Sequence, residues 1–333
     1  MKKIVFAALA IAALAACSKE TTVDVVREEI AFGNAFVDNA TKADAATDPS
    51  YSTSGEEGKG VALTQFNVYG AVNGVNIFKG NTVTKGNAAY GDAWALEGTK
   101  QYWIAGANYK FVGVVDGSKT DVTAIAFDEA GLPETITYTA DGKTDLLCDV
   151  FTVEKAEPTY PLVAFNYTHL LSKINFAVKN TTDVSATNYR FVLIDAKLTN
   201  VYARGVYNVD EEDWTTTNSD ISEFVLEKLT INSADTQYHS QEVLLIPGSA
   251  VGVYLKANIQ ATDNGTEWTV VSTVEKTFSK ALGTVDGEDK TLAKATAYNF
   301  IVELGVGTEI QFTATAMPEW TDGDGDDNTV LNQ

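Results

Sequence analysis

The chain has 333 residues, of which 45% are hydrophobic, and its formal net charge is −21. This hydrophobic content is ample for packed cores and excludes a disordered protein, and the length predicts about two domains of roughly 150 residues each. The negative charge argues against nucleic acid as a partner, because phosphates select lysine and arginine, and against adsorption of the folded part to anionic lipid.

The first sixteen residues have the layout of a secretory signal peptide. Two lysines precede an unbroken apolar run at 4–16, which is shorter than the run of about 20 residues that a membrane-spanning helix needs. The run ends in Leu14-Ala15-Ala16-Cys17, which resembles a lipobox, the site where bacterial lipoproteins are cut before a cysteine that is then acylated. Cys17 is therefore predicted to carry a lipid tether; the alternative is an ordinary signal peptide with an incidental cysteine.

Beyond residue 60 the sequence pattern predicts many short β-strands and no long helix. Apolar and polar residues alternate, which is typical of antiparallel strands with one buried face; in 172–180, for example, Lys173, Asn175 and Lys179 are expected to face solvent. The predicted strands lie at 66–72, 109–115, 172–180, 189–196, 251–261, 267–274 and 309–317. The pattern favours an all-β fold of antiparallel β-sandwiches.

Five parts are expected along the chain. The segment 154–161 holds two of the six prolines, and we interpret it as the boundary between two domains. The parts are a signal peptide at 1–16, a lipidated N-terminal segment at 17–60, an N-terminal β-sandwich at 61–160 with its first strand at about 28–38, a C-terminal β-sandwich at 161–320 and an acidic tail at 321–333.

The sequence holds no motif that would carry catalysis, so we predict neither an enzyme nor a cofactor. The two histidines, His169 and His239, lie in separate strands, without a Ser-His-Asp order, an HExxH motif, a paired CxxC or a phosphate-binding glycine loop. His169 is interpreted as a hydrogen-bonded strand residue. Cys148 has no partner once Cys17 is acylated, and we interpret it as a small apolar strand residue.

The acidic tail contains part of the pattern of a calcium-binding loop. Asp322, Asp324 and Asp326 match the first three ligand spacings of an EF-hand loop. However, Asp327 stands where the loop needs glycine, and Gln333 stands where it needs glutamate. The three aspartates are therefore weak metal candidates, and a solvated acidic tail is the preferred interpretation.

A series of segments, taken together, resembles one known family. They are EEIAFGNAF (28–36), NATKADAA (39–46), ALEGTKQYWIAGANYKFVGVV (95–115), TDLLCDVF (144–151), VAFNYTHLLSKINFAV (163–178), LLIPG (244–248), ATAYNFIVEL (295–304) and IQFTATAMPEW (310–320). Each segment alone is common, but their order is similar to that of the fimbrillins of Bacteroidota, the type V pilins, which are exported as lipoproteins.

This resemblance implies two tandem transthyretin-like β-sandwiches and a structural role in fimbriae at the outer membrane and cell surface. It also implies that a protease associated with the outer membrane cuts the lipoprotein after a basic residue and removes the first strand. The vacated groove would then accept a strand from another subunit, with a C-terminal segment as the donor. The implied partners are other fimbrial subunits, the maturation protease and, through the lipid on Cys17, the outer membrane.

Two basic residues are candidates for the processed position, Arg27 and Lys42. Cutting at Arg27 would leave the strand at 28–38 in place, whereas the Lys42-Ala43 bond follows this strand, in the kind of polar, alanine-rich stretch where proteases act. The family favours arginine at the processed position, so lysine departs from its pattern. We predict cleavage between Lys42 and Ala43; the alternative is that this stretch is a plain linker.

Two questions stay open. The donor is either the end of the tail, where Val330 and Leu331 are large and apolar, or the strand at 310–317. The protein is either a fimbrial subunit that exchanges strands after it is cut or an uncut cell-surface lipoprotein. In the second case it would serve as a fimbrial anchor or accessory, or as a carbohydrate-binding module that uses exposed members of its 14 tyrosines and 5 tryptophans.

Overall fold

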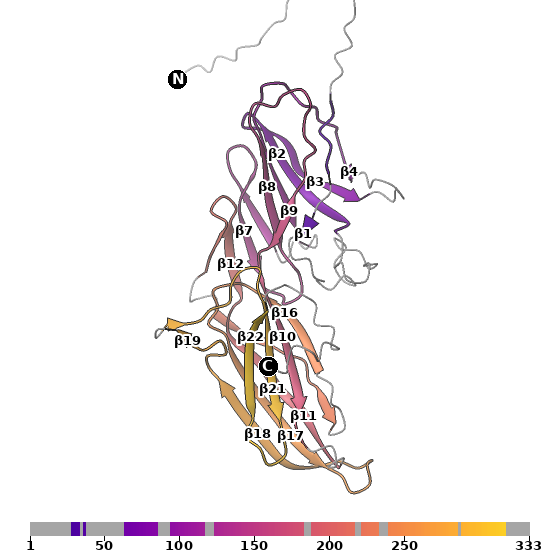
Figure 1. The fold of residues 1–333 in the computed structure, drawn as a ribbon, viewed down its shortest axis with the longest axis vertical. Coiled ribbons are helices and arrows are strands. Elements are labelled where there is room, and N and C mark those ends of the chain that lie inside the picture. Colours follow the sequence, from indigo (N-terminus) through magenta and orange to yellow (C-terminus); the bar gives the residue numbers. More distant parts are fainter. Residues whose placement is uncertain are drawn as a thin grey trace, which may run out of the picture.

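The computed structural model describes residues 28–33, 36–37, 63–85, 94–116, 123–182, 188–216, 221–232, 239–285 and 288–317. Its regular elements in these ranges are all β-strands, which confirms the predicted all-β class (Figure 1). No helix in the same ranges has the length and apolar character needed to cross a membrane.

The first body of the molecule, in the upper part of Figure 1, is built on a seven-stranded sheet. In spatial order its strands are β1 (Phe36–Val37), β9 (Asn166–His169), β8 (Leu147–Val153), β5 (Tyr109–Val115), β2 (Gln65–Val72), β3 (Val75–Lys85) and β4 (Trp94–Leu96). All of these pairs are antiparallel except β1 with β9. A four-stranded sheet adds β13 (Asp213–Thr215), β12 (Arg204–Asn208), β7 (Pro133–Thr139) and β6 (Thr123–Phe127).

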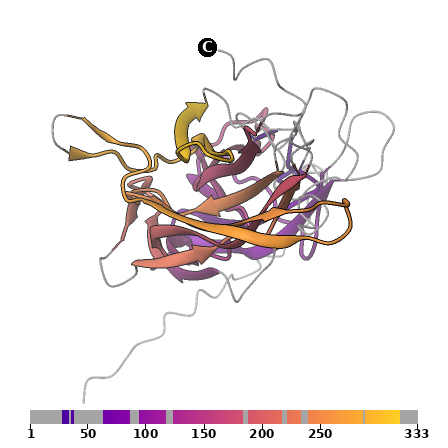
Figure 2. The same cartoon turned by 90° about the horizontal axis from the view of Figure 1, so that it is seen from below.

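The second body consists of two sheets that enclose one core. One sheet contains β16 (His239–Leu245), β10 (Ser172–Asn180), β21 (Ala297–Leu304) and β22 (Gln311–Met317). The other contains β14 (Ile221–Val225), β11 (Tyr189–Tyr202), β17 (Gly252–Ala261) and β18 (Thr269–Phe278), with β15 (Thr230–Asn232) paired to β11. The short pair β19 (Thr284–Val285) and β20 (Glu288–Asp289) stands apart. Seen from below in Figure 2, yellow β22 and the orange β17–β18 hairpin lie on different layers.

The predicted alternation is confirmed in β17 and fails in two central strands. Residues 111, 112, 114 and 115 of β5 are all at most 1% exposed, because one face of the seven-stranded sheet packs against an aromatic core and the other against the β7–β12 sheet. In β10, Lys173 and Asn175 are buried as well. Their polar atoms find partners there: Lys173 Nζ lies 3.0 Å from Glu242, and Asn175 donates to Asn299 Oδ1 at 3.1 Å.

Strands from both sides of the expected boundary at residue 161 belong to the same sheets. Strand β9 belongs to the first body, and the hairpin β12–β13 pairs with β7, although both follow residue 161 in the chain. In the hairpin, Tyr207 is 3% exposed in the core between the sheets, and Trp214 Nε1 donates to the carbonyl of Leu170 at 2.7 Å. The expected division into domains stays a prediction, but a segment of the second half completes the first body.

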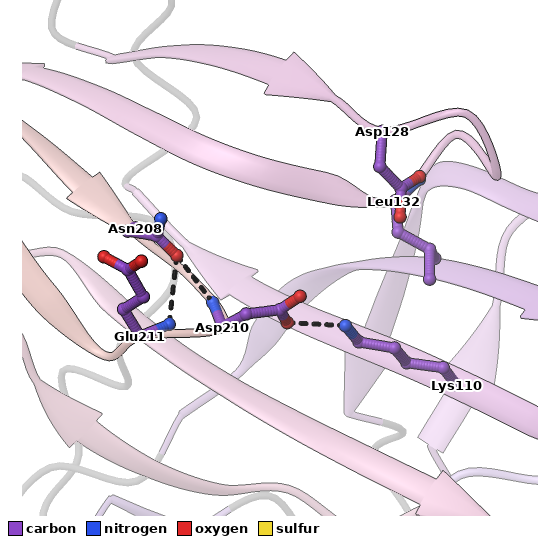
Figure 3. A network of polar contacts seen from close by, with 6 residues as sticks. All are labelled: Lys110, Asp128, Leu132, Asn208, Asp210 and Glu211. Carbon is purple, nitrogen blue, oxygen red and sulfur yellow. Dashed lines mark hydrogen bonds and ion pairs between the residues drawn. The ribbon is translucent and has the colours of Figure 1, made fainter.

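The turn of this hairpin also makes a polar contact with the first body (Figure 3). Asn208 Oδ1 accepts the backbone N–H groups of Asp210 and Glu211, each at 3.0 Å, which holds the turn closed. Lys110 on β5 then reaches Asp210 with 2.5 Å between Nζ and Oδ1. Since both side chains are partly solvent-exposed, this ion pair positions the turn more than it stabilises the fold.

Replacing Tyr207 by Ala should therefore destabilise the protein by about 3–5 kcal/mol, the range for removing a buried ring. Lys110→Ala is the matched control and should cost at most about 1 kcal/mol, because it removes an exposed ion pair. Urea unfolding followed by tryptophan fluorescence measures both free energies. Equal effects of the two substitutions would contradict the assigned roles of the core and the ion pair.

Cys148 is a buried strand residue in the same core, as predicted. Burial, with a smaller effect of the Asp149 charge, raises the pKa of its thiol to about 12. At pH 8 almost none of it is thiolate, which is the reactive form. Iodoacetamide should leave Cys148 unmodified in the folded protein and alkylate it fully in 8 M urea, as read by peptide mass spectrometry. Alkylation of the folded chain at the rate of a free cysteine would show that the core is open.

Candidate functional site

The residues predicted to matter most lie outside the described ranges. These are Cys17, Arg27, Lys42 and Ala43 at the N-terminal end and Asp322, Asp324 and Asp326 in the tail. The structure does place the strand that lies between Arg27 and Lys42: residues 28–33 and β1 are inserted into the first body. We call the place that residues 28–33 occupy the strand slot.

The backbone of residues 28–33 is hydrogen-bonded on both of its edges. On one edge, Ile30 N donates to Gln101 O and Trp103 N donates to Glu28 O, both at 2.9 Å. On the other edge, Gly33 N donates to the carbonyl of Val163 at 2.8 Å, and Val163 N donates to Ala31 O at 2.9 Å. Pairing is antiparallel toward residues 94–102 and parallel toward Val163. The segment is therefore an interior strand of the first body.

Alternate side chains of the segment point into the aromatic core. Ile30 is 2% exposed and Phe32 is 5% exposed. The Phe32 ring lies 6.1 Å from that of Phe66 and 5.8 Å from that of Phe78, centroid to centroid, in edge-on contacts. Burying two side chains of this size stabilises the inserted state by about 3–6 kcal/mol.

Aromatic rings pack against one another in the wall of the slot. Trp103, next to the edge that pairs with Glu28, is 6% exposed and lies 4.6 Å from the ring of Tyr109 and 5.5 Å from that of Tyr160. The Tyr109 hydroxyl in turn accepts the N–H of Ile104 at 2.7 Å. Desolvation by burial raises the pKa of Tyr109, so this hydroxyl stays neutral and keeps the contact at physiological pH.

The outer face of the slot is only lightly charged. Lys100 Nζ donates to Glu29 Oε2 at 2.7 Å, and this hydrogen bond raises the pKa of Lys100. On the edge that pairs with Glu29, Tyr102 and Ile104 are 41% and 57% exposed, and Leu162, which lies next to Gly33 on the other edge, is 59% exposed. Large exposed apolar side chains thus flank the inserted segment on both sides.

The slot has a clear chemical capacity, which is to bind an extended strand. Without residues 28–33, four backbone groups would lose their partners: Gln101 O, Trp103 N, Val163 N and Val163 O. The pocket of Phe32 would open to water at the same time. Unpaired strand edges beside an apolar surface bind other strands readily, since each buried unsatisfied group costs about 1–3 kcal/mol.

His169 is a buried residue of strand β9, and its ring contacts a buried carboxylate. Its Nδ1 lies 2.6 Å from Asp145 Oδ2, and the two side chains are 1% and 0% exposed. Asp145 also accepts the N–H of Leu146 at 2.8 Å. The pair lies where the chain passes from β9 into β10, and a substrate cannot reach it from solvent. His239, the other histidine, lies in β16, apart from this pair.

The described ranges give no support to a metal site or to a carbohydrate-binding surface. These ranges contain no group of three or more His, Cys, Asp or Glu residues that could hold a metal ion. Trp94 and Trp103 belong to the core, and the ring of Trp268 lies under the Arg190 guanidinium at 4.3 Å. The exposed aromatic rings of the described residues, Tyr102 and Phe127, are in different parts of the first body and form no row for a glycan.

Sequence reasoning located the inserted strand but missed the residues that hold it. Gln101, Trp103 and Val163 come from distant parts of the chain, and no local pattern marks them as neighbours of residues 28–33. One usable signal was the spacing of the two large apolar residues Ile30 and Phe32, two positions apart, after the charged Glu29, which is typical of a strand with a buried face.

Two known sequence families match parts of this chain. The fimbrillin-like family matches residues 41–320, and the prokaryotic membrane lipoprotein lipid attachment site matches residues 1–18. A search of curated proteins returned no match.

Solved structures share the fold. A fimbrial protein from Bacteroides vulgatus aligns with a TM-score of 0.57 and 15% identity, over 87% of this chain and 100% of its own. A candidate cell adhesion protein from Bacteroides uniformis aligns with a TM-score of 0.54 and 16% identity, over 88% of this chain and 98% of its own. The family match covers most of the chain, and it is this match that carries the assignment. This chain therefore belongs to the fimbrillin-like family, a family of structural proteins and not of enzymes, and it carries a lipoprotein lipid attachment site.

Proposed function

We propose that this protein is a subunit of surface fimbriae whose first strand only temporarily fills the strand slot. The observation that carries the proposal is the two-sided hydrogen bonding of residues 28–33 together with the burial of Ile30 and Phe32. A segment held in this way completes the precursor as a stable monomer. Once it is removed, the slot accepts a strand from another subunit.

The position of the candidate cut fits this sequence of events. The inserted segment and β1 lie at 28–33 and 36–37, after Arg27 and before Lys42. Cleavage between Lys42 and Ala43 would detach all of this strand from the rest of the chain, whereas cleavage after Arg27 would leave it covalently attached. Lys42 is therefore the functional processing site in this proposal, and the protease of the outer membrane is the partner that triggers assembly.

The lipid has a matching role. A signal peptide followed by acylation of Cys17 would hold the precursor at the outer membrane until the cut separates the tether from the folded part. The charge of the chain, −21, would keep the released subunits soluble and apart from anionic membrane surfaces until strand exchange joins them.

Intact mass and N-terminal sequencing of the protein from native cells separate this proposal from its alternative. A mature chain that begins at Ala43 supports shedding of the strand. A mature chain that still carries an acylated Cys17 would support a permanently anchored fimbrial anchor or accessory protein and would overturn the proposal.

Replacing Lys42 by Ala should abolish polymers and leave a stable monomer, because the slot stays filled. Lys42→Arg and Arg27→Ala are the matched controls, and both should assemble normally. The measurement is the ladder of heat-sensitive polymers on a denaturing gel together with electron microscopy of the cell surface. Normal fimbriae from Lys42→Ala cells would contradict the assigned processing site.

Replacing Cys17 by Ala should remove the incorporation of labelled fatty acid and release the precursor from the membrane fraction, because no thiol remains for the lipid. Cys148→Ala is the control and should label like the parent chain, since Cys148 is buried in the core. Unchanged labelling of Cys17→Ala would show that the lipid is attached elsewhere.

A further inference from the structure

One end of the first body is remote from the second body. Strand β9 leads at His169 into β10 of the second body, and β8 begins opposite His169 at Leu147 and runs away from it. The end of β8 at Val153, and the residues aligned with it across the sheet, Tyr109 and Val72, therefore lie at the remote end. We call this end, at the top of the first body in Figure 1, the tip.

Three loops form the tip, at 73–75, 104–108 and 154–157. Hydrogen bonds join all three. The carbonyl oxygen of Asn108 accepts the N–H of Asn73 at 2.8 Å, and its Oδ1 accepts the N–H of Lys155 at 2.9 Å. Gly106 N donates to the carbonyl of Ala156 at 2.7 Å. The tip is thus one connected surface.

Large apolar side chains are exposed at this tip. Val75 is 65% exposed in the first loop, and Ile104 projects from the second. Tyr102 precedes the buried Trp103, and Leu162 lies beside the end of β8, so both border the same surface. Soluble surfaces usually scatter such residues singly, and a group of four at one end marks an interaction surface.

The tip carries little charge, in a chain with a net charge of −21. The loops that contain Val75 and Ile104 have no charged residue, and the segment 154–157 has a charge of −1. Beside the slot, Lys100 is paired with Glu29 at 2.7 Å. Such a surface offers no basic cluster for phosphate or for an acidic protein. Exposed aliphatic side chains with a tyrosine at the border are suited to the interfacial layer of a bilayer of zwitterionic lipid.

The chain that leads from the lipid attachment site enters the first body at the tip. Glu28 O accepts the N–H of Trp103, the residue before Ile104, and residues 28–33 then run parallel to the start of β9. Residues 18–27 separate Glu28 from Cys17, which lies in the matched lipid attachment site. Even fully extended, this stretch spans at most about 40 Å. In an acylated precursor the tip is therefore the end of the protein that is held next to the bilayer.

We propose that the tip is a lipid-contacting surface. In the acylated precursor Val75, Tyr102, Ile104 and Leu162 lie in the interfacial layer of the bilayer that holds the lipid of Cys17. The tether raises the local concentration of lipid at the tip, so four side chains that would bind vesicles weakly on their own are sufficient. This contact turns the second body away from the bilayer. The inference goes beyond the proposed function, because it needs the lipid but neither cleavage nor strand exchange.

A fluorescent probe at the tip tests the contact in the acylated precursor. Ile104→Cys is labelled with a nitrobenzoxadiazole maleimide, while Cys148 stays unmodified because it is buried and Cys17 because its sulfur carries the lipid. The labelled precursor is reconstituted into phosphatidylcholine vesicles with brominated acyl chains, which quench a fluorophore only on contact. Its emission should fall by about half relative to vesicles without bromine, as expected for a group at the headgroup–acyl boundary. Unquenched emission would overturn the proposal.

Val271→Cys is the matched control, because Val271 is 56% exposed, like Ile104, and lies at the opposite end of the molecule (Figure 1). It lies beside the turn of the β17–β18 hairpin, next to the pair of Ala261 with Tyr189, where β11 begins after β10 has run away from the first body. Its label should not be quenched. Equal quenching at the two positions would show adsorption without orientation and would overturn the proposal.

Two further measurements identify what holds the tip. Adding Tyr102→Ser and Leu162→Ser to the labelled Ile104→Cys precursor should restore most of the emission, because the apolar contact is lost. Replacing part of the phosphatidylcholine by anionic phosphatidylglycerol should weaken quenching, because the charge of −21 is repelled. Stronger quenching with the anionic lipid would mean that charge holds the protein. Blue-shifted emission without quenching would mean that a second copy covers the tip. Either result would overturn the proposal.

Discussion

The structure depends on one constraint, which is that a buried strand must pair its backbone on both edges. Residues 28–33 satisfy this constraint for Gln101, Trp103 and Val163 at once, and no other part of the described chain takes that place. The first body is thus complete only while a strand is inserted.

A hairpin from the second half of the chain packs into the first body at the junction between the two bodies. The hairpin β12–β13 leaves the second half of the sequence, pairs with β7 and contributes Tyr207 to the core of the first body. The buried pair of His169 and Asp145 lies close by, where β9 gives way to β10. Core packing and hydrogen bonds therefore both cross the junction between the two bodies.

Much of the fold could be predicted from local pattern, and the failures share a cause. Alternation located β17 and β22, and the isolated Cys148 was correctly interpreted as a core residue. The burial of Lys173 could not be predicted, because a lysine at a polar position of a strand is expected to be exposed. Its partner Glu242 comes from a distant part of the chain. The membership of β9 and β12 in the first body was missed for the same reason, since pairing between distant segments leaves no local mark.

By itself the sequence determined the all-β class, the export signal with its lipobox, the absence of catalytic motifs and the presence of a strand between Arg27 and Lys42. These features are local, because periodicity, turn residues and short motifs depend only on residues that are close in the sequence. Only the tertiary structure decided that this strand fills a slot between residues 101–103 and Val163, and that β22 is an edge strand of the second body. Such relations are set by which backbone edges meet in space, and that depends on the packing of the whole chain.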